Sequence, residues 1–325
     1  MKREQILYHN SEIALPRSIR FWLMLIFVVP SVIFTSLVLL YLLTDQAARK
    51  ALHNHPVIIL LCIALIFQLT DTVWYLEFLQ RGSVKPATPI RCLLWWFVDL
   101  GLYNTASLIL SWATLERHIL IFHNRWIATT NRRFLLHYAP LILLLLYCFI
   151  YYIWILLDPP CEHQFIYDLP VCSETPCHLL HPFFGIWETG IHGCLSTLII
   201  AIFSIALLCR VIHQKRRLHQ VFQWRKYRKM IVQLISISML YLVCNFPIMI
   251  ISFTRICCIA PDAWVDVQHF AFLLSYWVMF LLPFVALGSI QDLTKLYGVS
   301  HCYNRLFHRR IASINCNQNA VGTRK

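Results

Sequence analysis

Residues 134–157 read FLLHYAPLILLLLYCFIYYIWILL and contain no aspartate, glutamate, lysine or arginine. A helix needs about 20 mostly apolar residues to cross the hydrocarbon core of a bilayer. This stretch meets that requirement in both length and composition. It predicts a membrane-spanning helix and sets the standard against which the rest of the chain is compared.

Six other stretches meet the same standard, which makes seven predicted spans. They are Phe21–Leu43, Val57–Leu79, Cys92–Phe122, Phe134–Leu157, Phe183–Ile212, Met230–Thr254 and Val267–Ile290. The third, fifth and seventh carry polar residues at helical spacing, which is typical of bundle helices with one face turned inward. The alternating pattern of a membrane β-barrel does not occur. The predicted fold is an all-α membrane protein, with a seven-transmembrane helix bundle over residues 21–290.

The overall composition agrees with this fold. Hydrophobic residues make up 59% of the chain and charged residues 13%, whereas soluble domains average about 45–50% and about a quarter. The mean hydropathy is +0.62. These values exclude a typical cytosolic enzyme, a disordered tail protein and a fibrous repeat. No nucleophile–base pair and no Cys/His array with zinc spacing occurs, so we expect no enzyme activity, no cofactor and no metal.

Lysine and arginine are unevenly distributed over the loops. The chain has 28 of them against 15 Asp and Glu. Because they lie between the spans, they indicate topology and contact with anionic lipid, not nucleic acid. Twenty lie in residues 44–56, 117–133, 210–229 and 291–325, and eight in residues 1–20, 80–91, 158–182 and 255–266. Basic residues favour the cytoplasmic side, so the N-terminus is predicted outside and the C-terminus inside.

The segments outside the bundle have simple interpretations. Residues 1–20 are predicted to be an extracellular tail without a signal peptide, since the first apolar run is long and has no small-residue cleavage site. Residues 291–325 mix leucine and aromatic residues with basic ones, which predicts a short interfacial amphipathic helix and a cytoplasmic tail. Cys302 in this segment is either palmitoylated or a free thiol.

Four cysteines belong to the predicted outer face. The loop 158–182 carries Cys161, Cys172 and Cys177, and Cys92 opens the third span on the same side. An oxidising compartment favours two disulfides among them, and four cysteines allow three pairings. A hairpin closed by Cys161–Cys172 would leave Cys177 for Cys92, which is the pairing we expect. The alternative is that the four remain free thiols.

Two features of the third span occur together in a known family. Its inner end reads SWATLERHILIF, with Glu116-Arg117, and Cys92 lies 25 residues before Arg117. The sixth span has Cys244-Asn245-Phe246-Pro247, and the seventh has Leu282-Pro283-Phe284-Val285-Ala286. The chain thereby resembles the rhodopsin-like (class A) G-protein-coupled receptors over roughly residues 20–300, as a divergent orphan member. Asn245, Leu282 and Ala286 depart from that family's sixth- and seventh-helix motifs.

The resemblance implies roles for these motifs. Glu116 and Arg117 would form the coupling site for a heterotrimeric G protein, and Pro247 and Pro283 would kink helices whose inner ends move, with Asn245 at the switch. The alternative for Arg117 is an arginine that snorkels to the membrane interface. For the two prolines, the alternative is a packing irregularity without a switching role.

Ionisable residues inside a span are functional candidates. Asp99 lies 18 residues before Arg117, and Tyr276 seven before Pro283. By resemblance to amine receptors, this pair would bind a cationic extracellular ligand, an amine or a peptide. The alternative is a structural carboxylate satisfied by Tyr276 or Asn104. Further candidates for the pocket wall are Tyr103, Glu188, His192 and Trp96.

The alternatives for the last three candidates are local. Glu188 and His192 are one turn apart, so they are also expected as an i, i+4 pair. Trp96 is also expected as an interfacial aromatic residue.

Three functions remain open at this point. The first is a plasma-membrane receptor that passes an extracellular signal to a G protein. The second is a transporter or channel with Asp71, Asp99 and Glu188 as its ion path, although an odd span number and the lack of an internal repeat are unusual for one. The third is a seven-helix scaffold that has lost signalling.

Overall fold

The computed structural model describes residues 15–122, 129–173, 175–217, 224–256 and 265–287. Within these ranges the chain is largely helical and forms no strand. Seven helical runs are long and apolar enough to cross a membrane: Arg17–Thr44, Leu52–Arg81, Pro89–Phe122, Thr130–Leu157, Pro182–Arg210, Ile231–Thr254 and Phe270–Leu287. Each overlaps one predicted span, so the seven-helix architecture is confirmed. We number the runs spans 1 to 7; the predicted interfacial helix in 291–325, with Cys302, and most of the predicted tail lie outside the described residues.

Three spans are single helices and four are built from several segments. Spans 1, 6 and 7 are α2 (Arg17–Thr44), α13 (Trp224–Ile256) and α14 (Val265–Leu287). Span 2 comprises η1 (Leu52–Asn54), α4 (His55–Leu69) and α5 (Asp71–Arg81). Span 3 comprises α6 (Pro89–Trp96), η2 (Phe97–Leu102) and α7 (Tyr103–Phe122).

The remaining elements complete spans 4 and 5 and the loops. Span 4 comprises α8 (Thr130–Arg133), η4 (Phe134–Tyr138) and α9 (Ala139–Leu157). Span 5 comprises α11 (Pro182–Ile186), η6 (Trp187–Leu195) and α12 (Ser196–Arg217). Short loop elements are α3 (Gln46–Lys50), η5 (Pro170–Cys172) and α10 (Cys177–Leu180).

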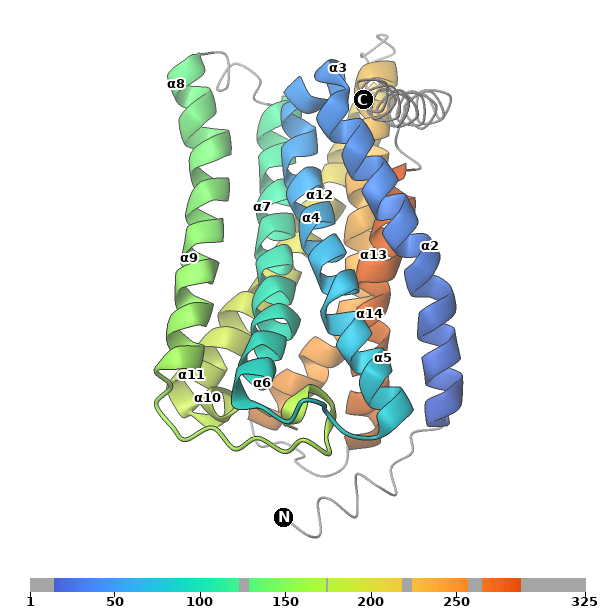
Figure 1. Ribbon diagram of the computed structural model, residues 1–325. Helices are drawn as coiled ribbons and strands as arrows, with labels where there is room; N and C mark the ends of the chain where they lie inside the picture. The colour runs from blue at the N-terminus through green and yellow to red at the C-terminus, as the bar shows by residue number, and fades with distance from the viewer. Residues whose placement is uncertain (1–14, 123–128, 174, 218–223, 257–264, 288–325) are drawn as a thin grey trace, which may run out of the picture.

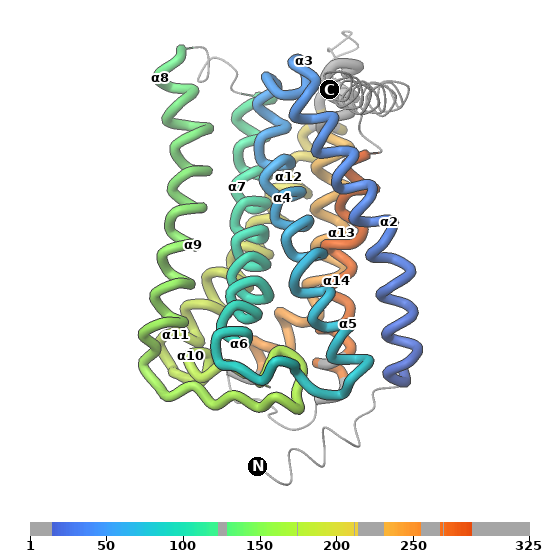
Figure 2. Tube along the Cα trace, viewed as in Figure 1, coloured from blue at the N-terminus to red at the C-terminus, as the bar shows by residue number. Residues whose placement is uncertain are grey.

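The spans stand side by side as an upright bundle (Figure 1), with α6, α10 and α11 at one end and α3 and α8 at the other. Following the predicted topology, we call these the outer and the inner end. Span 3 is central, because α7 contacts α4, α9, α12 and α13. The tube in Figure 2 shows the loop after α9 running back across the outer end, where η5 contacts α6.

The outward faces of the spans are apolar. Large side chains such as Ile26, Leu143 and Val243 are 63%, 65% and 67% exposed. A soluble monomer rarely exposes so much contiguous apolar surface. Lipid is therefore the solvent that suits this surface, whereas polar side chains such as Gln68 and Asp71 are fully buried inside the bundle.

The proline at position 283, inside α14, explains one buried polar cluster between spans 1, 2 and 7. Proline has no N–H, so the carbonyl of Met279 loses its helical hydrogen bond. The Gln68 side-chain amide donates to that carbonyl at 2.7 Å and to the Ser31 hydroxyl at 2.8 Å. Ser31 in turn donates to the carbonyl of Phe280 at 2.8 Å. Side chains of spans 1 and 2 thus donate hydrogen bonds to backbone carbonyls of span 7 in the turn before the proline.

Gln68→Leu should lower the free energy of unfolding by about 1–2 kcal/mol, because the buried Met279 carbonyl would lose its donor in an apolar medium. Denaturant unfolding in detergent micelles measures this change. Gln80→Leu, at an exposed position of α5, is the matched control and should leave stability within about 0.5 kcal/mol of the original. Equal stabilities of the two variants would contradict the role given to Gln68.

Three spans contain a π-helical segment, in which one turn is wider than in an α-helix: η2, η4 and η6. Such segments occur often at functional sites. Each of the three contains buried ionisable residues: Asp99, His137, Glu188 and His192. Hydroxyl side chains bond the backbone there, since Thr105 donates to the Gly101 carbonyl at 2.6 Å and Ser196 to the Gly193 carbonyl at 2.9 Å.

The outer-loop cysteines form two disulfides, but with exchanged partners. Cys92 pairs with Cys172 and Cys161 with Cys177, at Cα–Cα distances of 5.7 and 6.1 Å. The predicted bonds Cys92–Cys177 and Cys161–Cys172 are therefore wrong. The prediction that all four cysteines pair at one end of the bundle is confirmed.

The reason for the exchange is a turn that is tighter than the predicted hairpin. The amide of Ile166 donates to the carbonyl of Cys172 at 2.8 Å. Val171 and Cys172 then take left-handed backbone conformations, with φ near 58° and 57°. This turn places Cys172 over the outer end of span 3, beside Cys92. The chain next continues to α10, which begins at Cys177 and returns to Cys161.

Candidate functional site

Two buried carboxylates lie close together near the outer end. Asp71 begins α5 and is fully buried, and Asp99 lies in η2 with 9% of its surface exposed. They are near enough to interact electrostatically. The Trp95 indole N–H donates to Asp71 Oδ1 at 2.5 Å. The Tyr276 hydroxyl is the second polar neighbour of the Asp71 carboxylate. Within the described part of the chain, no hydrogen bond reaches Asp99.

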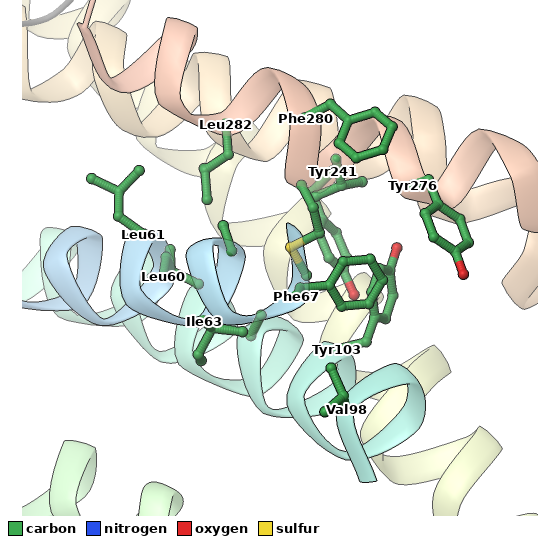
Figure 3. Close-up of a cluster of buried hydrophobic side chains, with 14 of the residues drawn as sticks. Leu60, Leu61, Ile63, Phe67, Val98, Tyr103, Tyr241, Tyr276, Phe280 and Leu282 are labelled. Atoms are coloured by element: carbon green, nitrogen blue, oxygen red, sulfur yellow. The ribbon is translucent and has the colours of Figure 1, made fainter. Parts of the chain in front are cut away.

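Aromatic rings from three spans surround these carboxylates. The ring of Tyr276 lies 5.2 Å from that of Tyr75 and 5.3 Å from that of Phe67. Figure 3 shows Tyr276 and Phe67 approaching Tyr103 from different helices. The Tyr276 hydroxyl lies within hydrogen-bonding reach of the Asp71 carboxylate and close to Asp99.

We call Asp71, Asp99, Tyr75, Tyr276 and Trp95 the outer carboxylate centre. The sequence prediction that Asp99 and Tyr276 lie at one site agrees with this geometry, although no hydrogen bond joins them. Asp71 was missing from the predicted ligand site, and its contact with Trp95 cannot be inferred from their separation of 24 residues. The predicted alternative partner, Asn104, is bonded elsewhere.

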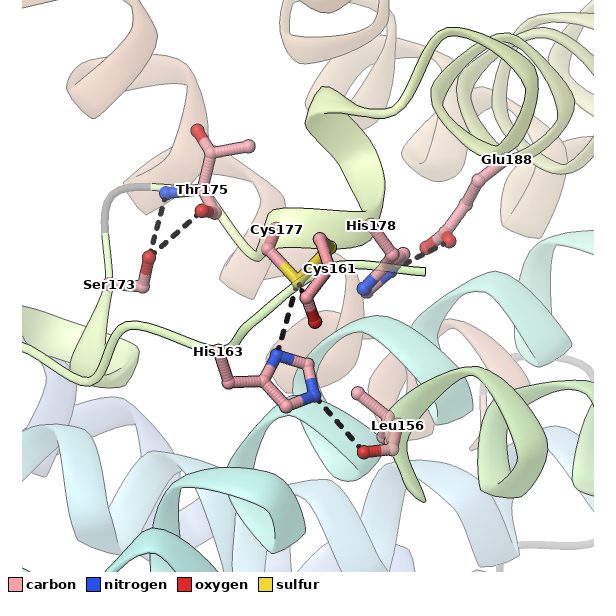
Figure 4. Close-up of a disulfide and its surroundings, with 8 residues drawn as sticks. All are labelled: Leu156, Cys161, His163, Ser173, Thr175, Cys177, His178 and Glu188. Atoms are coloured by element: carbon pink, nitrogen blue, oxygen red, sulfur yellow. Dashed lines mark hydrogen bonds and ion pairs between the residues drawn. A yellow bond between two sulfur atoms is a disulfide. The ribbon is translucent and has the colours of Figure 1, made fainter. Parts of the chain in front are cut away.

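Glu188 belongs to a separate cluster between spans 3, 4 and 5. Its Oε1 accepts hydrogen bonds from the Asn104 amide and the Tyr152 hydroxyl, each at 3.2 Å. Its Oε2 lies 3.2 Å from His178 Nε2 in α10 (Figure 4). The figure also shows the nearby Cys161–Cys177 bond. Glu188 is thus satisfied by protein groups and connects span 5 to the outer loop.

His192 lies on the other side of Tyr152 from Glu188. Its Nδ1 is 3.2 Å from the Tyr152 hydroxyl, and its Nε2 is 2.7 Å from the Tyr147 hydroxyl. No direct hydrogen bond between Glu188 and His192 occurs in the described structure; the Tyr152 hydroxyl lies between them. Neither the expected pocket wall with Asp99 nor the simple i, i+4 pair describes this arrangement.

Two further candidates have structural contacts. The Trp96 indole donates to the Val171 carbonyl at 2.5 Å, and its ring stacks on Phe165. Trp96 therefore anchors the outer loop, and it is buried and not interfacial. The Tyr103 hydroxyl donates to Asn245 Oδ1 at 2.9 Å. This bond links spans 3 and 6 two residues before Pro247, which lies inside α13.

The inner end contains a chain of histidines. Glu116 Oε1 makes a close contact with His137 Nδ1 in span 4, and both side chains are fully buried. His137 Nε2 lies 2.7 Å from His55 Nδ1, and His55 Nε2 lies 2.9 Å from the Arg49 carbonyl. This series of hydrogen-bonded side chains connects spans 2, 3 and 4 to the first inner loop. His137 was not predicted, although it is the only histidine in the apolar stretch 134–157.

Arg117 forms no hydrogen bond with Glu116 in the described structure. Its Nη2 donates to the His53 carbonyl at 2.7 Å, and the side chain is 1% exposed. Nε and Nη1 have no hydrogen-bond partner among the described residues. The side chain is therefore buried inside the bundle and does not snorkel to its surface. A desolvated guanidinium with two nitrogens unpaired favours the approach of an acceptor.

No protein-family model matches the chain, and no curated protein sequence matches it. Any functional conclusion therefore depends on the geometry of the two ends of the bundle.

Proposed function

We propose that this chain is a plasma-membrane receptor that binds an extracellular ligand and activates a heterotrimeric G protein. The observation that carries the proposal is the structure of span 3. Its outer part holds Asp99 and is tied to the outer loop by the Cys92–Cys172 bond, and its inner part holds Glu116 and Arg117. One continuous run thus joins a candidate ligand site to a buried ionic site at the opposite end.

The proposed orientation places the N-terminus outside and the C-terminus in the cytoplasm. Lysine and arginine support it, because 20 of 28 lie in the segments assigned to the inside. The two disulfides support it as well, since such bonds persist in an oxidising compartment.

Arg117 is the proposed coupling residue. In the closed bundle it has one carbonyl partner and two unpaired nitrogens. Separation of the inner ends would open it to carbonyl or carboxylate acceptors of a G protein. Tyr103 and Asn245 are the proposed link between the ligand site and span 6, because their hydrogen bond crosses from span 3 just below Asp99.

Arg117→Ala should reduce G-protein activation by about tenfold or more, since charge-assisted hydrogen bonds contribute about 1.5–3 kcal/mol and 1.4 kcal/mol corresponds to a factor of ten. A cell assay of G-protein dissociation, run over a ligand library and a panel of G proteins, measures it. Surface expression is quantified in the same cells.

Arg132→Ala is the matched control, because Arg132 is an exposed basic residue of the same inner face. It should activate G proteins like the original chain. Equal activation by Arg117→Ala at equal expression would contradict the coupling role. Solute flux without any G-protein response would instead favour a transporter, and the absence of both would favour a scaffold.

The transporter alternative has less support from the geometry. Its ion path requires Asp71, Asp99 and Glu188 to share one route. Asp71 and Asp99 lie between spans 2, 3 and 7, whereas Glu188 is bonded to groups of spans 3 and 4 and to the outer loop.

A further inference from the structure

We propose that His178 and Glu188 form a binding site for one extracellular proton, and that binding this proton strengthens the attachment of the outer loop to span 5. His178 lies in α10, which belongs to the loop between spans 4 and 5, and Glu188 lies in η6. The inference rests on the proposed function in one respect only, that this end of the bundle faces the outside. It does not depend on the G protein.

Glu188 is a buried acidic group with no basic residue beside it. Its side chain is 3% exposed, and no lysine or arginine of the described chain forms an ion pair with it. Residues 158–209, which include the outer loop and most of span 5, contain no lysine or arginine at all. A buried carboxylate needs compensating positive charge. Here that charge has to come from a histidine, the side chain that becomes cationic near neutral pH.

The surroundings of Glu188 favour its ionised form. Oε1 accepts hydrogen bonds from the Asn104 amide and the Tyr152 hydroxyl, and the Tyr151 hydroxyl lies within reach of the same carboxylate. Oε2 lies 3.2 Å from His178 Nε2, as Figure 4 shows. An ionised carboxylate only accepts hydrogen bonds, so it suits a ring of donors, whereas a protonated one would add a donor among them. A proton that reaches this pair is therefore taken up by the imidazole.

One nitrogen of His178 is open to the proton. Nε2 faces the carboxylate and carries its hydrogen there, as the donor of that contact. Nδ1 is buried and has no hydrogen-bond partner among the described residues. A proton from the extracellular solution binds the lone pair of Nδ1, so the imidazolium forms and the pair changes from one negative charge to none. Because hydrogen bonds between ionised groups are about twice as strong as neutral ones, the contact between α10 and span 5 becomes stronger.

His192, the other buried histidine near Glu188, is expected to stay neutral. The Tyr152 hydroxyl has one hydrogen, which it donates to Glu188, so its contact with His192 Nδ1 requires that nitrogen to be the donor. The Tyr147 hydroxyl accepts from the Trp187 indole and donates to His192 Nε2. Both nitrogens of the neutral ring thus have a suitable partner, and a proton on Nε2 would displace the Tyr147 donor.

The other titratable groups of the outer loop do not bond to this pair in the described structure. The ring nitrogens of His163 face the Leu156 carbonyl and the Cys177 sulfur. Span 4 contributes the thiol of Cys148, beside Tyr152. The exposed titratable side chains of the described loop are Asp158, Glu162, Asp168 and His181.

The pair lies at a junction of the outer loop with the bundle. Cys177, the residue before His178, is bonded to Cys161, which follows span 4. Glu188 is bonded to spans 3 and 4 as well, through Asn104 and Tyr152. A proton on His178 therefore strengthens the place where the loop meets spans 3, 4 and 5, and its release weakens that place. By linkage, the attached loop holds the proton more tightly than a detached loop does.

The test is thermal unfolding of the full-length protein in lipid nanodiscs at about pH 5.5 and about pH 7.5, on either side of the range in which histidine changes charge. His178→Gln keeps a neutral N–H donor for Glu188 but takes up no proton. The stabilisation by the proton is present at acidic pH and is lost as the pH rises. The melting temperature of the original chain minus that of His178→Gln should therefore be about 2–4 °C larger at the lower pH.

His181→Gln is the matched control, because His181 is an exposed histidine of the same loop. Its difference from the original chain should be the same at both pH values. Groups that all these proteins share, such as His163, cancel in the comparison. His192→Gln should keep the pH-dependent increment, whatever its overall stability, because His192 stays neutral.

Glu188→Gln is the second variant, and it keeps the inference testable if His178→Gln does not fold. It removes the carboxylate charge with little change of shape, so it should lose the same increment of about 2–4 °C. The double variant His178→Gln, Glu188→Gln should lose no more than either single one, since both remove the same interaction.

Three results would overturn the inference: a difference between the original chain and His178→Gln that is the same at both pH values, an increment that persists in Glu188→Gln, or one that disappears in His192→Gln. A chain that shows the increment but activates no G protein would refute only the proposed function. One that activates a G protein but shows no increment would refute only this inference.

Discussion

His137→Phe is expected to destabilise the protein by about 3–5 kcal/mol, because it leaves the buried Glu116 carboxyl group without its partner. Glu116 and His137 are both fully buried and bonded to each other. Phenylalanine would fill most of the space, but Glu116 would lose its only hydrogen-bond partner among the described residues, since its Oε2 is already unpaired. Chemical unfolding in detergent micelles measures the loss.

The control for this prediction is a double-mutant cycle with Glu116→Leu. Replacing both partners of a buried pair by apolar residues is often nearly neutral. The double variant should therefore be more stable than His137→Phe alone, with an interaction energy of about 1–3 kcal/mol. His55→Phe, at the half-buried end of the same chain, should cost less. Additive effects of the two single substitutions would show that the pair contributes no specific stabilisation.

Removing the Cys92–Cys172 bond by the double substitution Cys92→Ala and Cys172→Ala should cost about 2–5 kcal/mol. The bond joins residues 80 positions apart, whereas Cys161–Cys177 joins residues 16 apart. In the loop-entropy account, the longer connection contributes about 1–2 kcal/mol more. The Cys161→Ala, Cys177→Ala protein is therefore the matched control, and thermal unfolding of both measures the difference.

Interpreting these stabilities requires that the pairing of the four cysteines is known. Trypsin cannot separate the three loop cysteines, because residues 158–182 contain no lysine or arginine. Cleavage at Asp168 and at Glu174 does separate Cys161, Cys172 and Cys177 into different peptides. Mass spectrometry should then find Cys92 linked to Cys172. A peptide linking Cys92 to Cys177 would contradict the structure of the outer loop.

The placement of polar groups gives the bundle two distinct ends. At the inner end, Glu116 Oε1 is bonded to His137 and Arg117 Nη2 to the His53 carbonyl, while Arg117 Nε and Nη1 have no partner among the described residues. At the outer end, Glu188 and Asp71 are bonded to neighbouring side chains, whereas no hydrogen bond reaches Asp99 in the described structure. Buried groups that the protein itself satisfies are expected to stabilise the fold. Those it leaves open are where a ligand or partner is expected to bind.

The π-helical segments explain how these groups reach the interior. Each wider turn rotates the following part of the span relative to the preceding part, so the side chains on the two sides of the turn no longer follow one α-helical face. Glycine permits the close approach in two of them: a Cβ on Gly101 would lie 3.1 Å from the Tyr152 ring, and one on Gly193 would lie 2.5 Å from the Met249 sulfur. Helical spacing alone therefore misplaces residues beyond each turn.

Much of the architecture was predictable from the sequence. The seven spans follow from local hydrophobicity, which is a property of each stretch by itself and needs no partner. The resemblance also grouped Asp99 with Tyr276, and the two lie near each other in the structure; that they form a ligand site stays a prediction. The four outer cysteines were placed on one side by the same reasoning.

The pairings between spans were decided only by the tertiary structure. The hydrophobic pattern places a helix in lipid but does not determine its rotation or its height relative to its neighbours, and a shift of one residue rotates a side chain by about 100°. His137 was therefore not predicted as the partner of Glu116, and Trp95 was not predicted as the partner of Asp71. The partner of Cys92 likewise depended on the left-handed backbone conformation of Val171 and Cys172. No local sequence pattern predicts that conformation.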